Sequence, residues 1–496
     1  MEINEIIQQR LAKLKALEAK GISPYGARFM RSGSIAGVLS EFSEGKSVCL
    51  AGRIMAERIH GKASFLDIND QTGKIQAYIK EDIIGQENFA LFNSLDIGDI
   101  VGVEGELFKT RTGEPTVKVS NLTILSKSLR PLPEKWHGLK DVETRYRQRY
   151  IDLISNSDVR KVFAMRSSII TKIREFFDKR GYLEVETPII QTIAGGATGK
   201  PFKTHHNIYD IDLFLRIAPE LYLKRLIVGG FEKVYEINKS FRNEGISTRH
   251  SPEFTMLEAY TAYTDYEDMM NLTEELITFL AKEILGKTKI TYQNNEIDLT
   301  TPWNRLSFAK EIKDMYGISP EDDLNEWLRK LKEKGSARNL GIDLKAKISR
   351  SQLTHLITEL FQPDSKHAPT FAIDLFTEAC PLAKPKKDNP LLAERFELFI
   401  GGIEVANAYS ELNDPLEQRA KFEAELKDLP KDQVRQIDED FLEALEYGMP
   451  PCGGLGIGID RLAMLFTDSQ SIRDVILFPL LKPIPSADEQ TSRSSE

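Results

Sequence analysis

The spacing of hydrophobic residues divides the chain into regions of different structure. In residues 3–20, apolar residues recur at steps of three and four, which predicts an amphipathic helix. Between residues 47 and 126, apolar residues fall in five short runs separated by turn signals such as HGK, QTG and RTGE, which predicts strands. The sequence therefore predicts a helical extension over 1–46 and a small β-rich domain after it.

Five strands in so short a segment favour a closed barrel of the oligonucleotide-binding type, in which one strand face stacks bases on aromatic rings. On that face we place Arg58, Phe65 and Gln76, which offer a cation, a ring and an amide. The alternative for Phe65 is a place in the barrel core. Basic residues of the first helix, such as Arg10 and Lys13, either contact RNA phosphates or form a solvated helix face.

The region from 127 to 150 is punctuated by prolines and then strongly charged, which is typical of a linker. After it we expect a larger domain over 151–482, with charged helical segments inserted at about 305–375. The polar tail 483–496 has the composition of a disordered segment.

Composition limits the class of protein. The 496 residues are 41% hydrophobic and 28% charged, as in globular proteins, and the length indicates more than one domain. Because no stretch approaches the ~18 consecutive apolar residues of a spanning helix and no secretion signal is evident, we expect a cytoplasmic protein without a membrane segment. Cys49, Cys380 and Cys452 have no spacing typical of zinc or disulfide sites. A net charge of -9 argues against bulk affinity for nucleic acid, so any RNA site must be local.

Two glycine-rich segments fail the common nucleotide-binding motifs. Residues 195–200 are one residue short of a P-loop and lead into Pro201, where serine or threonine is required. In GGLGIGID, Ile459 stands where a dinucleotide motif needs its third glycine. A nucleotide site in this chain must have another architecture.

Two apolar runs, 231–244 and 252–260, flank a short polar loop and predict an antiparallel hairpin. Alternation gives each strand one face, which carries Glu236, Asn238 and Arg242 on the first strand and Phe254, Glu258 and Tyr260 on the second. Near the loop, guanidinium groups suit phosphate oxygens and a ring suits a base. A structural cluster of ion pairs is the alternative.

The run CGGLGIGIDRLAMLF predicts a strand that leads into a helix. Gly454, Gly456 and Gly458 share one strand face and leave room for a flat ligand against the backbone. Arg461 can then reach a purine or a terminal phosphate.

Three segments, FDKRGYLEVETPII, FRNEG with RHSPEFTMLE, and GLGIGIDRL, resemble in order motifs 1, 2 and 3 of class II aminoacyl-tRNA synthetases. With a barrel ahead of them, their order is that of the subgroup containing the lysyl, aspartyl and asparaginyl enzymes. The resemblance covers about 3–482. Within the subgroup, GGATGKPF, RIAPELYLKRL and EVANAYSELND are most similar to the lysyl family.

The resemblance to lysyl-tRNA synthetases implies a ligase that activates lysine with ATP and transfers it to tRNA(Lys). The lysine pocket that it implies consists of Gly196, Glu220, Glu258, Tyr260, Asn407 and Glu411. Electrostatics agrees, because an ammonium taken out of water requires acidic partners such as Glu258 and Glu411, whereas an aspartate substrate would require a cation.

The same resemblance implies that Arg242 binds the α-phosphate of ATP, Phe254 stacks on adenine, and Arg461 holds the far end of the nucleotide. Glu244 and His250 would complete the pocket. Arg242 and Arg461 are the expected catalytic residues.

Glu397 and Glu404 resemble the magnesium ligands of the family. A two-residue turn at Gly401-Gly402 would pair Phe399 with Glu404 and leave Glu397 diagonal to Glu404 on the same face. Two carboxylates so placed suit a hard divalent ion. Alternation alone does not bring Asn407 into one site with Glu404, so a bulge or bend is required.

In the barrel, the anticodon-reading positions implied by the resemblance are Arg58, Phe65, Gln76 and Glu114. Beside motif 3, Cys452-Gly453 replaces the Thr-Ala associated with many relatives. A thiol at that place would make the enzyme sensitive to alkylation.

We therefore expect an α+β protein, with an oligonucleotide-binding barrel followed by a class II catalytic domain on an antiparallel sheet, assembled as a homodimer. An aspartyl or asparaginyl enzyme is one alternative, which Glu411 disfavours. A lysyl transferase acting on a protein is another, although such relatives lack the barrel. A catalytically inactive RNA-binding protein is the third, which the intact Arg242, Phe254 and Arg461 disfavour.

Overall fold

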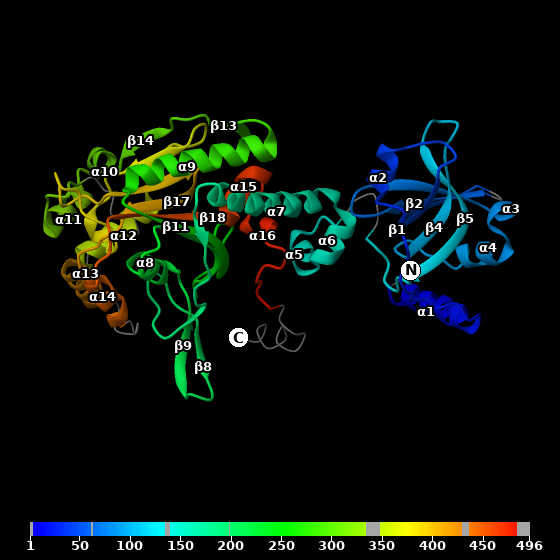
Figure 1. Ribbon diagram of the computed structural model, residues 1–496, viewed down its shortest axis with the longest axis horizontal. Helices are drawn as coiled ribbons and strands as arrows, with labels where there is room; N and C mark the ends of the chain where they lie inside the picture. Colours follow the sequence, from blue (N-terminus) through cyan, green and yellow to red (C-terminus); the bar gives the residue numbers. More distant parts are fainter. Residues whose placement is uncertain are drawn as a thin grey trace. The chain divides into compact units, whose positions relative to one another are not determined.

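The computed structural model describes residues 3–60, 63–133, 139–197, 199–333, 348–428 and 436–483. The chain divides into two compact units, unit 1 (Met1–Lys140) and unit 2 (Asp141–Glu496) (Figure 1). The tail predicted to be disordered lies outside the described residues from position 484 onward. Residues 334–347 of the predicted insertion lie outside them too.

Unit 1 is a closed barrel with the strand order β1-β2-β3-β5-β4. Its elements are α1 (Ile3–Ala19), α2 (Ile35–Ser40), β1 (Ser47–His60), β2 (Ala63–Asn69), β3 (Lys74–Lys80), α3 (Glu81–Ile84), α4 (Gln86–Phe92), β4 (Ile100–Lys109) and β5 (Pro115–Ser126). Alternate residues such as Leu50, Leu66 and Val103 are buried in its core, because successive side chains of a strand point to opposite faces. The predicted barrel is confirmed.

Helix α1 is anchored by the basic residues that were candidates for RNA contacts. Arg10 is buried, and its guanidinium donates to the carbonyl oxygens of Ser128 at 2.8 Å and Ile97 at 3.0 Å. Lys13 forms an ion pair of 2.7 Å with Asp96. The interpretation of Arg10 as a phosphate ligand is therefore wrong, because its donors are used within unit 1.

Unit 2 is built on an eight-stranded sheet in the order β14-β15-β16-β17-β18-β11-β10-β6. Neighbouring strands are antiparallel except in the pairs β14–β15 and β10–β6. The strands are β6 (Leu183–Glu184), β10 (Lys233–Phe241), β11 (Glu253–Ala262), β14 (Asn304–Ser307), β15 (Thr370–Ile373), β16 (Arg395–Ile400), β17 (Ile403–Ser410) and β18 (Cys452–Gly458). This confirms the predicted α+β class with a mainly antiparallel sheet.

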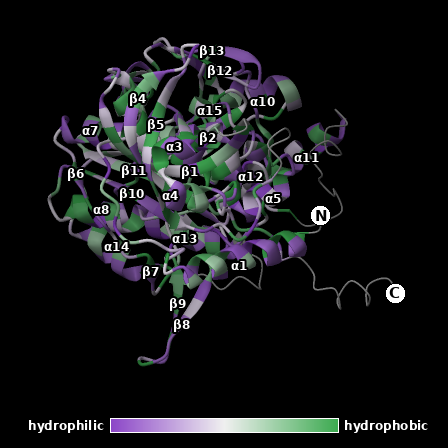
Figure 2. Ribbon diagram, turned by 90° about the vertical axis from the view of Figure 1, so that its right-hand side faces the viewer, coloured by the Kyte–Doolittle hydropathy of each residue, from purple (hydrophilic) through white to green (hydrophobic). Residues whose placement is uncertain are grey.

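The remaining elements of unit 2 cover or extend this sheet. The helices are α5 (Val142–Arg147), α6 (Arg149–Ser155), α7 (Ser157–Asp178), α8 (Glu220–Val228), α9 (Tyr266–Leu280), η1 (Ala281–Leu285), α10 (Phe308–Tyr316), α11 (Leu324–Glu333), α12 (Arg350–Leu360), η2 (Thr377–Ala379), α13 (Pro415–Asp428), α14 (Glu439–Glu446), α15 (Ile459–Thr467) and α16 (Ile472–Val475). Smaller sheets comprise β7 (Ile190–Gln191), β8 (Lys203–His206) and β9 (Ile211–Leu215), and β12 (Lys289–Tyr292) with β13 (Asn295–Asp298). The β8–β9 hairpin projects from unit 2 in Figure 1 and Figure 2.

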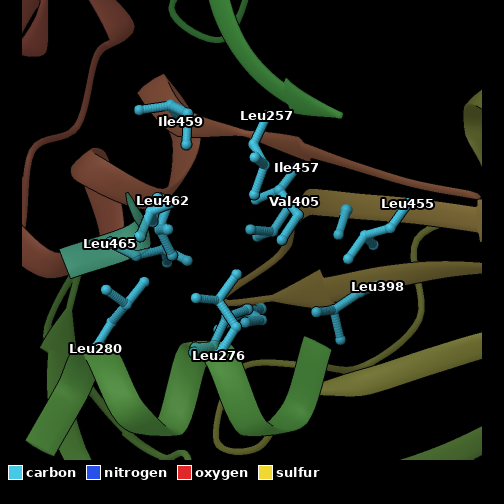
Figure 3. Close-up of a cluster of buried hydrophobic side chains, with 14 of the residues drawn as sticks. Leu257, Leu276, Leu280, Leu398, Val405, Leu455, Ile457, Ile459, Leu462 and Leu465 are labelled. Carbon is cyan, nitrogen blue, oxygen red and sulfur yellow. The ribbon is translucent and has the colours of Figure 1, made fainter. Parts of the chain in front are cut away.

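One face of the main sheet forms the core of unit 2. Figure 3 shows Leu398, Val405 and Leu455 of three adjacent strands meeting Leu276 of α9, while Leu462 and its helix α15 close the same cluster. Alternation then directs the neighbours of these residues to the opposite face of the sheet. That opposite face carries the polar candidates.

Two predicted boundaries differ from the observed elements. The region predicted as a linker contains α5 and the start of α6, and Tyr146 of α5 donates to Asp474 at 2.8 Å within unit 2. The predicted insertion at about 305–375 includes most of β14 and all of β15, which are strands of the main sheet. Helices α10, α11 and α12 lie between these two strands in the sequence. Over the described ranges, no helix combines the length and the apolar character needed to cross a membrane.

Candidate active site

The polar face of the main sheet borders a cavity of about 440 Å³ and an adjoining one of about 140 Å³. The larger is lined by Gly196, Glu220, Arg242, His250, Glu258, Tyr260, Glu397, Glu404, Asn407, Glu411 and Arg461. Glu244 and Phe254 line the smaller one, together with several of the same residues. The structure therefore brings together every residue predicted for the catalytic unit.

One end of the larger cavity is acidic. Glu220 at the start of α8, Glu258 on β11 and Glu411 just after β17 all have buried side chains. Lys224, which the sequence analysis did not identify, binds Glu220 Oε1 at 2.7 Å and also forms an ion pair with Glu411 Oε2. These carboxylates outnumber the lysine that neutralises them.

The buried carboxylates differ in how fully their oxygens are satisfied. Tyr409 donates to Glu220 Oε2 at 2.7 Å, and Tyr260 donates to Glu258 Oε2 at 3.3 Å. Glu411 Oε1 is buried and has no hydrogen-bond donor among the described residues. A buried acceptor without a donor costs free energy, so this oxygen marks a place where a ligand donor would bind.

Burial also changes the proton affinity of these groups. Desolvation, with the negative charges of Glu220 and Glu236, raises the pKa of Glu258 to about 8. Burial likewise raises the pKa of Glu411, and Glu220 adds to this effect, while Lys224 opposes it. A cation entering the cavity would stabilise the ionised forms.

Gly454 is required for a reason that differs from the one predicted. A Cβ atom at this position would lie 1.8 Å from Glu411 Oε1 and 2.7 Å from the ring of Tyr260. The space above Gly454 is therefore filled by protein groups and is not left for a flat ligand. At Gly456 the nearest atom to such a Cβ is the methyl group of Met256, at 3.2 Å.

The hairpin of β10 and β11 supplies the basic part of the site. Glu236 pairs with Glu258 and Ser240 with Phe254, so the predicted alternation is confirmed. Arg242 follows β10, and its guanidinium carbon lies 5.3 Å from the centre of the Phe254 ring. Its Nε atom is buried without an acceptor among the described residues, which leaves a donor for a ligand.

The loop after Arg242 brings His250 to the start of α15. His250 Nε2 lies 3.3 Å from Arg461 Nη2, and its Nδ1 lies 2.9 Å from the hydroxyl of Ser247. Burial, with the nearby charge of Arg461, lowers the pKa of His250. The imidazole is therefore neutral near pH 7 and leaves the positive charge to the arginines.

The hairpin of β16 and β17 contains the bulge that the sequence required. Phe399 pairs with Glu404 as predicted, but the register shifts by one residue beyond it, so that Glu397 pairs directly with Asn407. A bulge re-aims the side chains that follow it. As a result Asn407 Nδ2 lies 3.4 Å from Glu404 Oε1, within the same site.

Arginines hold both carboxylates of this hairpin. Arg461 contacts Glu404 at 3.2 Å and Arg395 contacts Glu397 at 2.8 Å. Burial, with the neighbouring Glu404, raises the pKa of Glu397 to about 7. Burial opposes ionisation of Glu404 too, but Arg461 and the amide of Asn407 lower its pKa.

A hard cation would find two carboxylates and an amide oxygen at this place. Within the described part of the chain, no group of three or more His, Cys, Asp or Glu side chains could hold a metal ion. Glu397 and Glu404 would therefore bind a divalent ion only together with oxygens of a ligand, which is the usual way that Mg²⁺ is held beside phosphates.

In unit 1, the predicted anticodon residues share one face of the barrel. Arg58 pairs with Phe65, Phe65 with Tyr78, and Asp67 with Gln76 across neighbouring strands. The ring centres of Phe65 and Tyr78 are 5.1 Å apart, and those of Tyr78 and Phe108 are 5.9 Å apart. Leu66 is buried in the core, so alternation points the half-buried Phe65 outward.

The polar groups of this face are paired with one another. Arg58 forms an ion pair of 2.6 Å with Asp67, and Gln76 Nε2 donates to Glu114 at 3.3 Å. Thr116 donates to Gln76 Oε1 at 3.0 Å. Tyr78 and Phe108 were not predicted. For Tyr78, its pairing with Phe65 on the adjacent strand was the available signal.

Comparison with known proteins gives two family matches. Residues 141–482 match the family described as tRNA synthetases class II (D, K and N). Residues 48–125 match the OB-fold nucleic acid binding domain.

Similar proteins cover nearly the whole chain. A lysine–tRNA ligase of Carboxydothermus hydrogenoformans is 54% identical over 489 residues, which are 97% of this chain and 99% of that protein. A lysine–tRNA ligase of Pelotomaculum thermopropionicum is 54% identical, covering 97% of this chain and 96% of its own. A lysine–tRNA ligase of Clostridium botulinum is 50% identical, covering 98% of this chain and 97% of its own.

The structure reverses the expectation that Cys452 makes the protein sensitive to alkylation. Its side chain is 1% exposed, and burial beside Glu411 raises its pKa, so the reactive thiolate is scarce. Native protein treated with iodoacetamide should be modified at the half-buried Cys49 well before Cys452, as measured by peptide mass spectrometry. Protein unfolded in urea is the control in which both react, and comparable native rates would contradict this prediction.

Proposed function

The chain belongs to the lysine–tRNA ligase family of class II tRNA synthetases, and from this premise we propose that it joins lysine to tRNA(Lys) in a reaction driven by ATP. Lysine and ATP would meet in the cavity on the polar face of the main sheet. The tRNA would bind both there and on the barrel of unit 1.

The observation that carries the choice of lysine is the excess of buried carboxylates at one end of the cavity. Glu220, Glu258 and Glu411 are buried around it, and Lys224 neutralises only part of their charge. In the ranges that the structure describes, no donor reaches Glu411 Oε1. Buried charge requires a counter-charge, which the side-chain ammonium of lysine supplies. Gly196, Tyr260 and Asn407 would complete the lysine pocket.

In the first step, the lysine carboxylate attacks the α-phosphorus of ATP, and the bond to pyrophosphate breaks. Arg242 would neutralise charge on the α-phosphate, while Phe254 beneath its guanidinium would stack on adenine. Arg461, next to His250 and Glu244, would hold the far phosphates. Catalysis then rests on orientation and electrostatic stabilisation, with no protein nucleophile.

In the second step, a hydroxyl of the terminal tRNA ribose attacks the carbonyl carbon of lysyl-adenylate, and AMP leaves.

We assign Mg²⁺ to Glu397 and Glu404, whose donor set of hard oxygens fits it. The ion would draw the phosphates together and offset their charge.

In unit 1, Arg58, Phe65, Gln76 and Glu114 would contact the anticodon. The row of Phe65, Tyr78 and Phe108 supports stacking of unpaired bases on that face. Sequence specificity would come from the paired polar groups beside the row.

We further propose that the protein works as a homodimer in the cytoplasm. The support for the compartment is that Cys49, Cys380 and Cys452 are all free thiols, as expected where thiols stay reduced. The support for the dimer is family membership. An aspartyl activity is disfavoured because a carboxylate side chain would enter an already acidic pocket. An asparaginyl activity is disfavoured because a neutral amide would leave the buried negative charge without a counter-charge.

The direct test is exchange of labelled pyrophosphate into ATP, with each amino acid offered separately. Exchange that depends on lysine is the expected result. Exchange with aspartate or asparagine but not lysine would overturn the assignment, and no exchange with any amino acid would favour an inactive RNA-binding protein.

The pKa of Glu258 predicts how lysine use depends on pH. Below its pKa of about 8, the Glu258 carboxyl group is protonated. It must lose that proton to bind the ammonium of lysine, so the affinity for lysine rises with pH. In wild type, the KM for lysine should fall as pH rises toward 8, by at most about ten-fold per unit. The Glu258→Gln variant should lose this pH dependence of the lysine KM. The KM for ATP serves as the control. A lysine KM that does not depend on pH in wild type would contradict the prediction.

Arg242→Ala should lower adenylate formation by roughly a hundred- to a thousand-fold, the loss typical of removing a donor aimed at transition-state charge. Thermal unfolding should change little, because Arg242 forms no ion pair with any of the described residues. Arg329→Ala, which breaks a surface pair with Glu326, is the matched control. Loss of thermal stability without selective loss of activity would instead favour a structural role for Arg242.

Phe65→Ala should impair aminoacylation by roughly ten- to a hundred-fold, because a stacked base contributes ~1 to 3 kcal/mol. Lysine-dependent pyrophosphate exchange should hardly change, since it needs no anticodon. Circular dichroism of the variant checks that the barrel is folded. Equal loss in both assays would show that Phe65 is a structural residue.

A further inference from the structure

Lys224 is a buried cation of unit 2 that takes no part in the proposed mechanism. It lies one helical turn after Glu220 on α8, at the spacing that places two side chains on the same helix face. Its side chain is 0% exposed, whereas both of its carboxylate partners line the cavity. Lys224 forms its ion pairs with Glu220 and Glu411, so it acts on the site through these two carboxylates.

The contacts of Lys224 decide which carboxylate oxygens remain for a ligand. Its ammonium forms ion pairs with Glu220 Oε1 and Glu411 Oε2. The hydroxyl of Tyr409 donates a hydrogen bond to Glu220 Oε2. Three of the four oxygens are thus held by the protein. The fourth, Glu411 Oε1, lies against Gly454 and has no donor within the described part of the chain.

We propose that Lys224 is a positioning residue for substrate specificity, which fixes Glu411 so that Oε1 accepts the side-chain ammonium of the amino acid. This inference rests on the proposed function of the cavity. The internal ammonium binds Glu220 Oε1 and Glu411 Oε2, so the acceptor that it leaves to a second ammonium is Glu411 Oε1.

Charge decides the direction of the effect when Lys224 is removed. Glu220, Glu258 and Glu411 would then stand together without an internal cation, and carboxylates so close cannot all stay ionised. One of them would take up a proton or turn away, and the acceptor for the substrate would be lost. Lysine binding should therefore weaken, although the net charge of the pocket becomes more negative.

A purely structural role is the competing explanation, and the chain offers a matched control for it. Lys127 in unit 1 is also 0% exposed and lies between two carboxylates, at 2.5 Å from Asp96 and 2.7 Å from Asp99. Replacing either lysine by methionine removes the same charge from a similar buried environment. Both variants should lose thermal stability, but only Lys224→Met should weaken the binding of lysine.

The experiment measures lysine-dependent pyrophosphate exchange by the full-length protein, with lysine and ATP titrated separately. Lys224→Met should raise the KM for lysine at least roughly thirty-fold, the lower end for a broken buried charge pair, with the KM for ATP within about two-fold. Lys127→Met should leave both unchanged. An unchanged or lower lysine KM in Lys224→Met overturns the inference.

A milder variant keeps the test decisive if Lys224→Met does not fold. Lys224→Gln removes the charge that holds Glu411 but keeps a hydrogen-bond donor at the same place, and should still raise the KM for lysine by at least roughly three-fold, as for one buried hydrogen bond. Wild-type lysine KM in that variant also overturns the inference. Wild-type protein without any lysine-dependent exchange would instead mean that the proposed function itself is wrong.

Discussion

The site depends on the antiparallel pairing of β11 with β10 and β18, and of β17 with β16 and β18. Because side chains alternate along each strand, this pairing sends Leu257, Leu398 and Leu455 into the core. Their neighbours Glu258, Glu397 and Gly454 then face the cavity. A shift of one residue in any strand would exchange the two faces, so the burial of the leucines and the placement of the carboxylates are fixed together.

The carboxylates of unit 2 fall into two groups by how fully they are paired. Arg216 contacts Glu236 at 2.6 Å, and Asp460 accepts from Arg166 at 2.5 Å and from the backbone of Thr255 at 2.7 Å. Such carboxylates hold elements together. Glu411 and Glu258 form the other group. Among the described residues, Glu411 Oε1 has neither an ion pair nor a hydrogen-bond donor, and the pKa of Glu258 is raised to about 8. In the absence of a ligand, the burial of these two carboxylates is not fully compensated. Incomplete pairing therefore separates groups that face a ligand from groups that stabilise the fold.

The sequence predicted those features that follow from alternation and from turn length. The barrel, the faces of β10 and β11, and the pairing of Phe399 with Glu404 across Gly401-Gly402 could all be derived in this way. The position of the bulge beyond Phe399 could not, since it depends on packing at the shared face of three strands. Lys224 was overlooked because a lysine in an amphipathic helix is ordinarily exposed, and only the tertiary position of Glu411 buries it. The residue types suggested that Cys452 is reactive and that Gly454 leaves room for a ligand. In the structure, the carboxylate of Glu411 helps to raise the pKa of Cys452 and fills the space above Gly454.

Unit 1 illustrates how a chain with a net charge of -9 can offer a surface to a polyanion. Three of its cations are used within the unit, because Arg10 and Lys127 are buried in internal contacts and Arg58 is paired with Asp67. Stacking does not need net charge, since every base presents an apolar face to an aromatic ring. The row of Phe65, Tyr78 and Phe108 supplies such a surface, and the Asp67 carboxylate holds Arg58 in place beside it. Recognition on this face would therefore depend on base geometry and fixed hydrogen-bonding groups, and its salt dependence would be smaller than that of a basic surface.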